Sequence, residues 1–322
     1  MKAIVQREYG DVEVLKMEDI DHPVVGQNDV LVRVVAASLN HADWIHTSGT
    51  PLVARLAFGT RRPKAMTRGK DVAGVVESVG TNVTAFRQGD EVYGELSSGT
   101  FAEYVAAPAS LLARKPVNLT FEQAAAVPLS GMTALVGLRD AGSVTPGQRV
   151  LVNGASGGVG TFAVQIAKAL GAEVTAVSSA ANAALVQSLG ADHVVDYGRD
   201  DFTRGTARHD VIFDLIGNHT LTELRSALTS KGVLVLSSGT GGRVVGPMGR
   251  ILKAVAISPL IGQKLKPFTQ NGSTKTLNEL RDLIEAERVT PAIDRIYRLA
   301  EVPAAMRYFV DEHARGKVAI SV

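Results

Sequence analysis

The feature that most constrains the fold is a glycine-rich segment at Asn153–Gly160, with the sequence Asn-Gly-Ala-Ser-Gly-Gly-Val-Gly. Before it, the apolar run Arg149–Val152 predicts a buried strand, and after it apolar residues recur at helical spacing as far as Leu170. Strand, glycine turn and helix in this order suit a dinucleotide phosphate, because glycines let the backbone approach the pyrophosphate and the helix N-terminus offers free N–H groups. The segment therefore favours dinucleotide binding over a tight turn without a ligand.

Composition and charge exclude several classes of protein. The chain has 322 residues, enough for two domains, and its net charge of +2, with no run of lysines and arginines, gives no sign of a nucleic-acid partner. It contains no cysteine, so disulfides and cysteine-ligated zinc are impossible. No apolar run approaches the ~20 residues of a membrane span, and Met1–Gln6 alternates like a strand rather than a signal peptide. We expect a cytoplasmic protein without a membrane partner.

The first third of the chain is rich in strand patterns. The candidates are Val30–Ala36, Val72–Gly80, Glu91–Gly94 and Thr100–Val105, separated by glycine turns. Few helices interrupt them, which indicates an irregular, barrel-like β domain. The last residues, Lys317–Val322, also have a strand pattern, and we expect this strand to return to the first domain.

Strands and helices alternate in the second half of the chain, after a helical stretch at 122–142 that is broken around Pro128 and Gly131. A less regular stretch, Val244–Gly262, precedes a sixth strand candidate at Lys264–Thr269 and a helix at Thr274–Glu287. This alternation predicts a parallel, doubly wound sheet with helices on both faces. The other strand candidates are 149–153, 173–178, 193–197, 210–216 and 232–237, and the helical stretches between them are 159–170, 180–189 and 219–229.

The segment Ile45–Thr67 differs from its surroundings. It contains prolines and glycine and is rich in basic residues, among them Arg55, Arg61 and Arg62. One interpretation is a long exposed loop with solvated charges. The other is a lid over an active site that also receives an acidic group, because long loops in compact domains are often functional. The sequence leaves both open.

The end of the second strand indicates which nicotinamide cofactor is bound. In this fold an acidic residue there binds the 2′-hydroxyl of NAD and repels the 2′-phosphate of NADP. The only acid of the strand, Glu173, lies at its start, whereas Ser178, Ser179 and then Asn182 stand at its end and can donate hydrogen bonds to a phosphate. We therefore expect NADP(H). Capping of the next helix is a second interpretation of the serines, and both can hold together.

Several segments together resemble one protein family over nearly the whole chain. The combination is similar to the zinc-independent NADPH:quinone oxidoreductase (zeta-crystallin-like) branch of the medium-chain dehydrogenase/reductase superfamily. In the branch's Asn-Pro-x-Asp stretch, His41 stands in place of proline. The segments that carry the resemblance are Ala36–Asp43, Gly69–Val76, Gly89–Gly94, Pro128–Ala134 and Gly154–Gly160.

The resemblance implies an α/β chain of two domains. A GroES-like, β-rich catalytic domain would comprise residues 1–122 and 273–322, and a Rossmann domain with a doubly wound parallel sheet would comprise residues 123–272. It also implies a homodimer that joins the edge strands of the nucleotide domains, here Lys264–Thr269.

The resemblance also implies roles for residues at matching positions. Asn40 and Thr133 would lie near the nicotinamide, with Asn40 orienting it or the substrate carbonyl. The family's usual basic residue after the second strand is absent, since alanines stand there. The pyrophosphate would be held by Gly157, Gly158 and Val159, and the 2′-phosphate would be reached by Ser178 and Tyr197. Lys317 would approach the cofactor from the tail of the chain. The other residues expected in the cofactor site are Gly154, Ser156, Gly160, Ser179, Asn182, Gly217 and Ser238.

Zinc is not expected. Zinc alcohol dehydrogenases of the superfamily carry a cysteine where Asn40 stands, and a histidine followed by an acid where Lys70-Asp71 stands. A catalytic zinc needs about three protein ligands, and the nearby His41 and His46 do not supply them.

The expected activity is hydride transfer from NADPH to a quinone or an α,β-unsaturated carbonyl. Asn40 or the Lys70 ammonium could stabilise the charge that develops on the acceptor oxygen, and the proton could come from solvent or from Tyr104. Pairing of Lys70 with an acid is an equally good interpretation. Two alternatives stay open: a regulatory or sensor protein that binds NADPH without turnover, and an enoyl-thioester reductase whose phosphorylated carrier meets Arg55, Arg61 and Arg62.

Overall fold

The computed structural model describes residues 1–237, 242–270, 272–312 and 314–322. Its contacts divide the chain into two compact units. Unit 1 comprises Met1–Met132, Asn271–Glu287 and Pro291–Val322, and unit 2 comprises Thr133–Gln270 with Arg288–Thr290. Within the described residues, none of the helices combines the length and the apolar character that crossing a bilayer requires.

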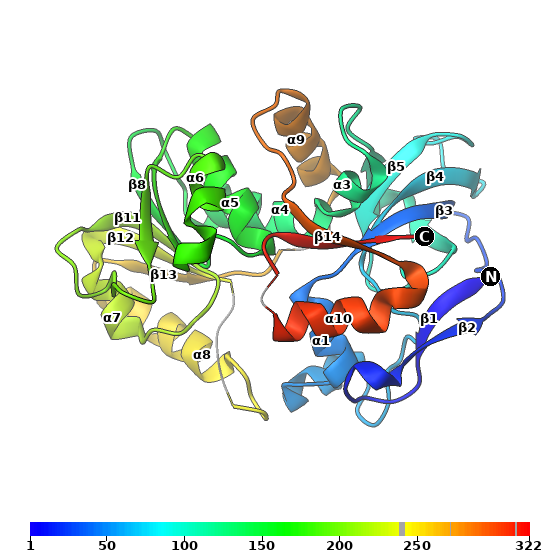
Figure 1. Ribbon diagram of the computed structural model, residues 1–322, viewed down its shortest axis with the longest axis horizontal. Coiled ribbons are helices and arrows are strands. Elements are labelled where there is room, and N and C mark those ends of the chain that lie inside the picture. The colour runs from blue at the N-terminus through cyan, green and yellow to red at the C-terminus, as the bar shows by residue number, and fades with distance from the viewer. Residues whose placement is uncertain (238–241, 271, 313) are drawn as a thin grey trace. The chain divides into compact units, whose positions relative to one another are not determined.

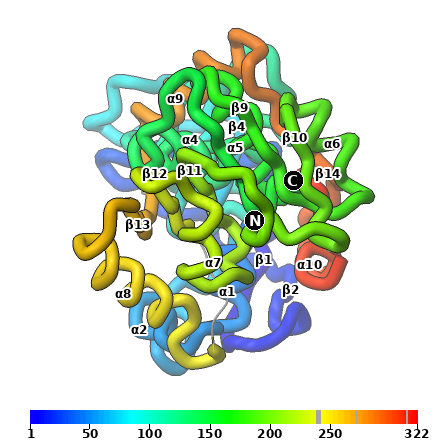
Figure 2. The backbone as a smooth tube through the Cα atoms, turned by 90° about the vertical axis from the view of Figure 1, so that its left-hand side faces the viewer, coloured from blue at the N-terminus to red at the C-terminus, as the bar shows by residue number. Residues whose placement is uncertain are grey.

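Unit 2 contains a six-stranded parallel sheet in the order β10-β9-β8-β11-β12-β13. Figure 2 shows β13 and β10 at its opposite edges. The order reverses between β8 and β11, which is the switch point of a doubly wound sheet and the usual place for a ligand. The predicted parallel sheet and its sixth strand are thus confirmed. The strands are β8 (Arg149–Asn153), β9 (Glu173–Ser178), β10 (His193–Asp196), β11 (His209–Asp214), β12 (Leu228–Leu236) and β13 (Lys264–Pro267).

Helices cover both faces of this sheet. Figure 1 shows α5 (Gly158–Ala169) and α6 (Ala183–Ser188) on one face, and α7 (Leu221–Ser226) and α8 (Met248–Ile257) on the other. Phe162 of α5 and Phe213 of β11 are fully buried, which places the hydrophobic core between sheet and helices. The short helices are the 3₁₀ turns η5 (Ala180–Asn182) and η6 (Ser258–Leu260), and the π turn η4 (Gly137–Ala141).

The structure corrects the prediction for 244–262. This stretch was expected to be irregular, yet it contains the ten-residue helix α8. Leu252 and Val255 lie on an exposed side of α8, and Ala254 is its only fully buried residue, so the helix buries little of its apolar surface.

Unit 1 contains a seven-stranded sheet in the order β14-β15-β3-β4-β5-β7, with β6 pairing to β3, and a separate β1-β2 hairpin. The tail strand β15 pairs with β14 and with β3, so its predicted return to this domain is confirmed. The strands are β1 (Lys2–Gln6), β2 (Leu15–Asp19), β3 (Asp29–Ser38), β4 (Asp71–Val79), β5 (Glu91–Glu95), β6 (Tyr104–Pro108), β7 (Leu112–Arg114), β14 (Ile293–Arg298) and β15 (Lys317–Ser321).

One strand lies later in the chain than predicted. β6 begins at Tyr104 rather than at Thr100, because Ala102 forms a bridge with Ala3 of β1 and the buried Phe101 ring packs in the core. The core around Phe101 also contains Ile4, Leu39 and Met306.

The helices of unit 1 are short. The stretch 122–142 does break as expected near Pro128, but Gly131 lies inside α4, where a side chain would meet Leu280 Cδ1 at 3.2 Å. The glycine is therefore a packing contact and not a helix end. The helices are α1 (His41–Ser48), α2 (Arg55–Phe58), α3 (Phe121–Ala125), α4 (Pro128–Val136, which continues into unit 2), α9 (Thr274–Glu285) and α10 (Val302–Asp311), with the 3₁₀ turns η1 (Val12–Val14), η2 (Leu52–Ala54), η3 (Ala109–Leu111) and η7 (Leu299–Glu301).

Candidate cofactor cradle and buried polar cluster

The glycine cradle, Gly154–Gly160, lies in unit 2 directly after β8. Gly154 has φ +91°, a left-handed backbone that favours glycine, and turns the chain away from the strand. Gly157 is the N-cap of α5, whose first residue is Gly158. The first N–H groups of a helix have no intrahelical partner and carry the positive end of the helix dipole, so this end of α5 suits an anionic phosphate.

The glycines of the cradle are required for different reasons. A Cβ at Gly160 would lie 2.1 Å from the Gly154 carbonyl oxygen, and one at Gly154 would lie 2.7 Å from Ile216 Cδ1. At Gly157 the nearest atom would be 3.5 Å away, which is ordinary van der Waals contact, and φ is −82°. The fold therefore requires glycine at positions 154 and 160, whereas a side chain at position 157 would meet only an ordinary contact.

The end of β9 is linked to the cradle by a hydrogen bond. Asn182 Nδ2 donates to Ser156 Oγ over 3.1 Å, while the buried Oδ1 of Asn182 has no hydrogen-bond partner in the part of the chain that the structure describes. Ser178 is buried and its hydroxyl donates to the Ser179 carbonyl at 3.2 Å. Ser179 is the N-cap residue of η5, as the capping interpretation expects, but its side chain makes no capping hydrogen bond with the described residues.

The end of β10 brings a basic residue to this place that the sequence did not reveal. β10 pairs with β9, and the Tyr197 N–H donates to the Ser178 carbonyl over 3.1 Å. Asp196 Oδ1 accepts the Ala180 N–H at 3.1 Å, and Arg199 Nε lies 3.7 Å from Asp196 Oδ2. The guanidinium of Arg199 therefore lies near the residues that follow β9. The place of Arg199 could have been predicted from the strand order of the doubly wound fold, because the third strand lies beside the second.

A cavity of 210 Å³ lies at the carboxyl ends of β8, β9 and β10. Asn153 and Val177, the residues before Gly154 and Ser178, contribute to its wall, so the cavity adjoins both the cradle and the end of β9. Aromatic rings enclose it, and two of them, Phe202 and His219, meet edge to face at 4.8 Å. The other residues that line it are Tyr197, Asp200, Asp201 and Asn218.

A buried carboxylate organises the loop after β11. Asp214 is fully buried and accepts hydrogen bonds from Asn153 Nδ2 at 2.8 Å and from the Gly217 N–H at 3.0 Å. It also forms an ion pair with Arg250, which ties α8 to the end of β11. Gly217 has φ +78° and is held at this edge of the sheet. Ser238, the other residue expected after a later strand, lies outside the described residues.

The polar cluster lies in unit 1 and consists of Ser38, Asn40, Asp43, Asp71 and Lys317. Ser38 ends β3, Asp71 begins β4 and Lys317 begins β15, and these three strands are neighbours in the sheet. Their ends therefore meet at one end of the sheet, where the side chains of the cluster are buried. Asn40 follows β3 and is the N-cap of α1.

Hydrogen bonds connect every member of the cluster. Lys317 Nζ donates to Asn40 Oδ1 at 2.5 Å, and Asn40 Nδ2 donates to Asp71 Oδ2 at 2.9 Å. Asp71 Oδ2 also accepts the Ser38 hydroxyl at 2.9 Å. The Asn40 backbone N–H donates to Asp43 Oδ2 at 2.9 Å.

Burial shifts the ionisation of two members. Burial of the Asp43 carboxyl, together with the charge of Asp71, raises its pKa to about 7, against the opposing influence of Lys70. Burial lowers the pKa of Lys317, and the carboxylates of Asp71 and Asp43 oppose this shift. Lys70 precedes Asp71 of the cluster and forms an ion pair with Glu95 at 3.3 Å. Of the two interpretations of Lys70, this ion pair confirms the pairing with an acid.

Tyr104 was expected at the active site as a proton donor, but the structure places it elsewhere on the sheet. Tyr104 pairs with Arg33 on β3, whereas Asp71 pairs with Ser38, five residues or roughly 17 Å further along that strand. The Tyr104 ring instead contacts His22, with 4.8 Å between ring centroids. The structure therefore does not bring Tyr104 to the polar cluster.

Lys317 was expected to contact the cofactor. Its three N–H groups already have three protein acceptors: Asn40 Oδ1, the Leu39 carbonyl at 3.0 Å and Asp71 Oδ2 at 3.4 Å. The ammonium is therefore committed to the polar cluster. Thr133, at the start of unit 2, is buried within α4.

The basic stretch Ile45–Thr67 is more ordered than either interpretation assumed. It contains the end of α1, a 3₁₀ turn and α2. Arg55 Nε donates to the Gly49 carbonyl at 2.9 Å and its guanidinium stacks on the Tyr9 ring at 4.4 Å, so Arg55 has a structural role. Arg61 and Arg62 are exposed neighbours.

The residues near Asn40 do not fit a catalytic zinc. The side chains at the positions of zinc ligands are the amide of Asn40 and the ammonium of Lys70, and a second ammonium, that of Lys317, is buried beside them. Cations do not ligate Zn²⁺, which is bound by thiolate, imidazole or carboxylate. His46 packs on Phe58 with 3.9 Å between ring centroids, and burial is the main cause that lowers its pKa to about 4.

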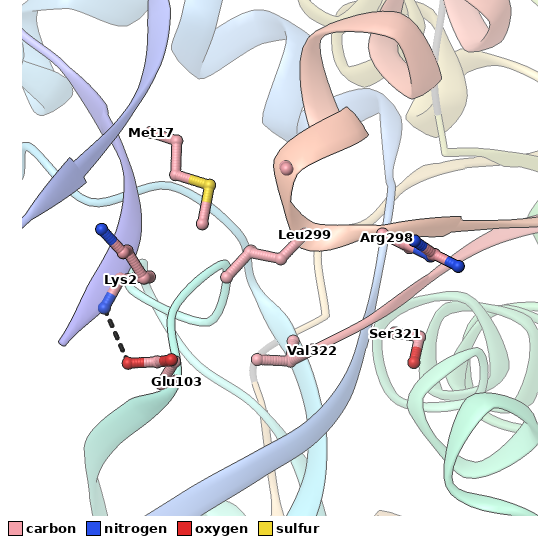
Figure 3. Close-up of a pocket in the computed structure, with 8 residues that line it drawn as sticks. Lys2, Met17, Glu103, Arg298, Leu299, Ser321 and Val322 are labelled. Atoms are coloured by element: carbon pink, nitrogen blue, oxygen red, sulfur yellow. Dashed lines mark hydrogen bonds between the residues drawn. The ribbon is translucent and has the colours of Figure 1, made fainter.

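A second cavity, of 330 Å³, lies in unit 1 and is drawn in Figure 3. On one side of it the Lys2 backbone N–H donates to Glu103 Oε2 at 2.7 Å. Ser321 at its wall ends β15, whereas Lys317 begins that strand, so roughly 13 Å of strand separates this cavity from the polar cluster. We assign the cavity no part in the site.

The chain matches two family models. Residues 26–117 match the alcohol dehydrogenase GroES-like domain, and residues 189–320 match a model described as zinc-binding dehydrogenase.

Curated proteins and solved structures are similar over the whole chain. The NADPH-dependent alkenal/one oxidoreductase of Arabidopsis thaliana, a chloroplastic protein, is 36% identical over 99% of this chain and 79% of its own length. The structure of the quinone oxidoreductase from Coxiella burnetii has a TM-score of 0.86 and 29% identity, and covers 100% of this chain and 99% of that one. The CurK enoyl reductase has a TM-score of 0.85 and 27% identity, with 99% and 98% covered.

Proposed function

The chain belongs to the medium-chain dehydrogenase/reductase superfamily, and on this premise we propose that it is an NADPH-dependent reductase of quinones or α,β-unsaturated carbonyls. The observation that carries the proposal is the glycine cradle at the start of α5, in which Gly157 is the N-cap although a Cβ there would approach no atom closer than 3.5 Å. The names of the Arabidopsis and Coxiella relatives support the cofactor and the two acceptor classes.

In this proposal the N–H groups at the start of α5 hold the pyrophosphate, and the 210 Å³ cavity beside β9 takes the adenosine. Three groups line the approach to the 2′-phosphate: the Asn182 amide, the Ser179 hydroxyl and the exposed Tyr197 ring. Arg199 supplies the positive charge that is missing directly after β9. When bound, NADPH supplies the hydride.

Asn40 of the polar cluster donates a hydrogen bond to the acceptor oxygen. That oxygen becomes negatively charged when a hydride reaches the conjugated carbon, and a fixed donor stabilises this charge. Tyr104 is dropped as the proton donor because of its distance along β3, so the proton comes from solvent. Lys70, paired with Glu95, contributes positive charge near the Asn40 side chain.

The proposal is tested by following NADPH and NADH absorbance with purified protein, 1,4-quinones and enones. We expect oxidation of NADPH and slower oxidation of NADH. Tight NADPH binding without turnover of any acceptor would instead establish the sensor protein. Preference for NADH would contradict the proposed contacts of the 2′-phosphate.

A second candidate is an enoyl-thioester reductase, favoured by the likeness to the CurK enoyl reductase and by the exposed pair Arg61 and Arg62. Arg55 is not available to a carrier, since its guanidinium stacks on Tyr9. The test compares an enoyl-coenzyme A with the same enoyl group on N-acetylcysteamine, which has no phosphate. This candidate requires a preference for the coenzyme A ester that the double variant Arg61→Ala, Arg62→Ala abolishes.

We also propose a homodimer joined through β13, which is an edge strand of the sheet. Light scattering after size exclusion measures the mass, and the mass of a single chain would contradict the proposed homodimer. A cytoplasmic location is the proposed compartment, to be checked by cell fractionation. The domain limits 1–122 with 273–322, and 123–272, are likewise proposed.

A further inference from the structure

The amide of Asn40 is held between two opposite charges. Lys317 Nζ donates to its Oδ1 at 2.5 Å, and its Nδ2 donates to Asp71 Oδ2 at 2.9 Å. An ammonium can only donate and a carboxylate can only accept, so these contacts allow one orientation of the amide. The flipped orientation would put NH₂ against NH₃⁺ and oxygen against carboxylate.

The two charged partners are themselves fixed. Lys317 uses its remaining N–H groups on the Leu39 carbonyl at 3.0 Å and on Asp71 at 3.4 Å. Asp71 accepts the Ser38 hydroxyl at 2.9 Å and, with its other oxygen, the Leu129 N–H at 3.0 Å. The side chains of Lys317 and Asp71 are 2% and 0% exposed, so water does not compete for these contacts.

One hydrogen of the Asn40 amide is left over. The amide nitrogen has two N–H groups, of which Asp71 takes one, and within residues 1–237, 242–270, 272–312 and 314–322 the structure gives the other no acceptor. The ammonium on the oxygen draws electron density away from the amide nitrogen, which strengthens the second N–H as a donor. Asn40 is 3% exposed, and a polar hydrogen of a buried side chain usually has an acceptor.

We propose that Lys317 and Asp71 are positioning residues, which fix the Asn40 amide in one orientation and leave its second N–H as the donor to the carbonyl oxygen of the hydride acceptor. The inference rests on the proposed reductase function, since that reaction supplies an oxygen that gains negative charge. It replaces the expected contact of Lys317 with the cofactor. Lys317 acts only through Asn40.

A double-mutant cycle tests this dependence. Lys317→Met and Asn40→Ala should each lower kcat roughly 100-fold, the usual order of effect for the loss or misplacement of one oxyanion donor. The double variant should be no slower than Asn40→Ala, because Lys317 has nothing left to position. The Kd for NADPH should stay unchanged in all three, and Lys275→Met, the same change at an exposed lysine of α9, should leave kcat unchanged.

A spectroscopic measurement does not depend on turnover. In ¹⁵N-labelled protein the side-chain amide pair of Asn40, identified by its absence in Asn40→Ala, should show two widely separated proton shifts that move together in Lys317→Met. Lys317→Met leaves Asp71 as a buried charge without a partner and can therefore fail to fold. In that case the double variant Lys317→Met, Asp71→Asn, which removes both charges, is used in place of Lys317→Met in both experiments.

The outcomes separate this inference from the proposed function. Absence of turnover by the wild type would overturn the reductase function and the donor role of Asn40 with it. Turnover by the wild type, together with effects of Lys317→Met and Asn40→Ala that multiply or amide shifts that do not respond to Lys317→Met, would overturn the positioning role alone.

Discussion

The glycine cradle of unit 2 and the polar cluster of unit 1 are assembled in different ways. The cradle is one continuous segment between a strand and a helix, so its parts are neighbours in the sequence. The cluster joins Asn40 to Asp71, 31 residues away, and Asp71 to Lys317, 246 residues away. The geometry of a local motif can be predicted from its own sequence, whereas a cluster of this kind can be predicted only when the order of the strands is known.

The comparison also separates what the two regions need. In the cradle, the left-handed backbone of Gly154 and the close approach of Gly160 to a backbone oxygen serve the fold, whereas a Cβ at Gly157 would make only an ordinary contact. In the cluster, the same side chains serve both purposes: Asp71 is buried by the fold and also orients Asn40. Function and stability should therefore be separable by substitution in the cradle and coupled in the cluster.

The largest effect is expected for the glycines of the cradle. Gly160→Ala places a Cβ 2.1 Å from a backbone oxygen and should lower the free energy of unfolding by about 3 kcal/mol. Gly157→Ala, with its nearest contact at 3.5 Å, should leave stability within about 0.5 kcal/mol of the wild type. Urea denaturation of both variants measures the difference. Equal losses would mean that position 157 is also a requirement of the fold.

The next effect concerns the pH dependence of the cluster. Burial raises the pKa of Asp43 from 3.8 to about 7, so the folded state binds this proton more tightly than the unfolded state. The contribution of Asp43 to stability is therefore present at acidic pH and falls as the pH rises from about 4 to about 7.

Asp43→Asn keeps an acceptor for the Asn40 N–H and removes the charge. Relative to the wild type, this variant should gain stability as the pH increases across that interval, measured by urea denaturation at several pH values. A difference in stability that does not vary with pH would contradict a raised pKa.

The smallest effect is expected at Arg199, the part of the cofactor site that depends on strand order. Arg199→Ala should weaken NADPH about fivefold and leave NADH unchanged, because an exposed ion pair contributes up to about 1 kcal/mol. Arg204→Ala is a matched control, since Arg204 is equally exposed and pairs with an acid three residues away. Isothermal titration with both cofactors measures the change. Equal losses for NADPH and NADH would remove Arg199 from the 2′-phosphate.

The same contrast explains what could be predicted from the sequence. The strand, turn and helix at Arg149–Ala169 were predicted to within one residue, because periodicity and glycine spacing are local signals. The helix α8 was missed because its start, with Pro247 as the N-cap and Gly249 as the second residue, has the composition of a turn. The partners of Lys317 could not be predicted, because they depend on which strands pair. The place of Arg199 was missed because it follows only when the strand order of the doubly wound fold is applied to β9 and β10. Tyr104 was misplaced for the same reason, since its register with β3 is not encoded locally.

The central claim, that the cradle binds NADPH at Gly157, is tested most directly by calorimetric titration of NADPH into the wild type and Gly157→Leu. We predict tight binding by the wild type and no measurable binding by Gly157→Leu, with both proteins folded by circular dichroism. Unchanged affinity in a folded Gly157→Leu protein would contradict the claim.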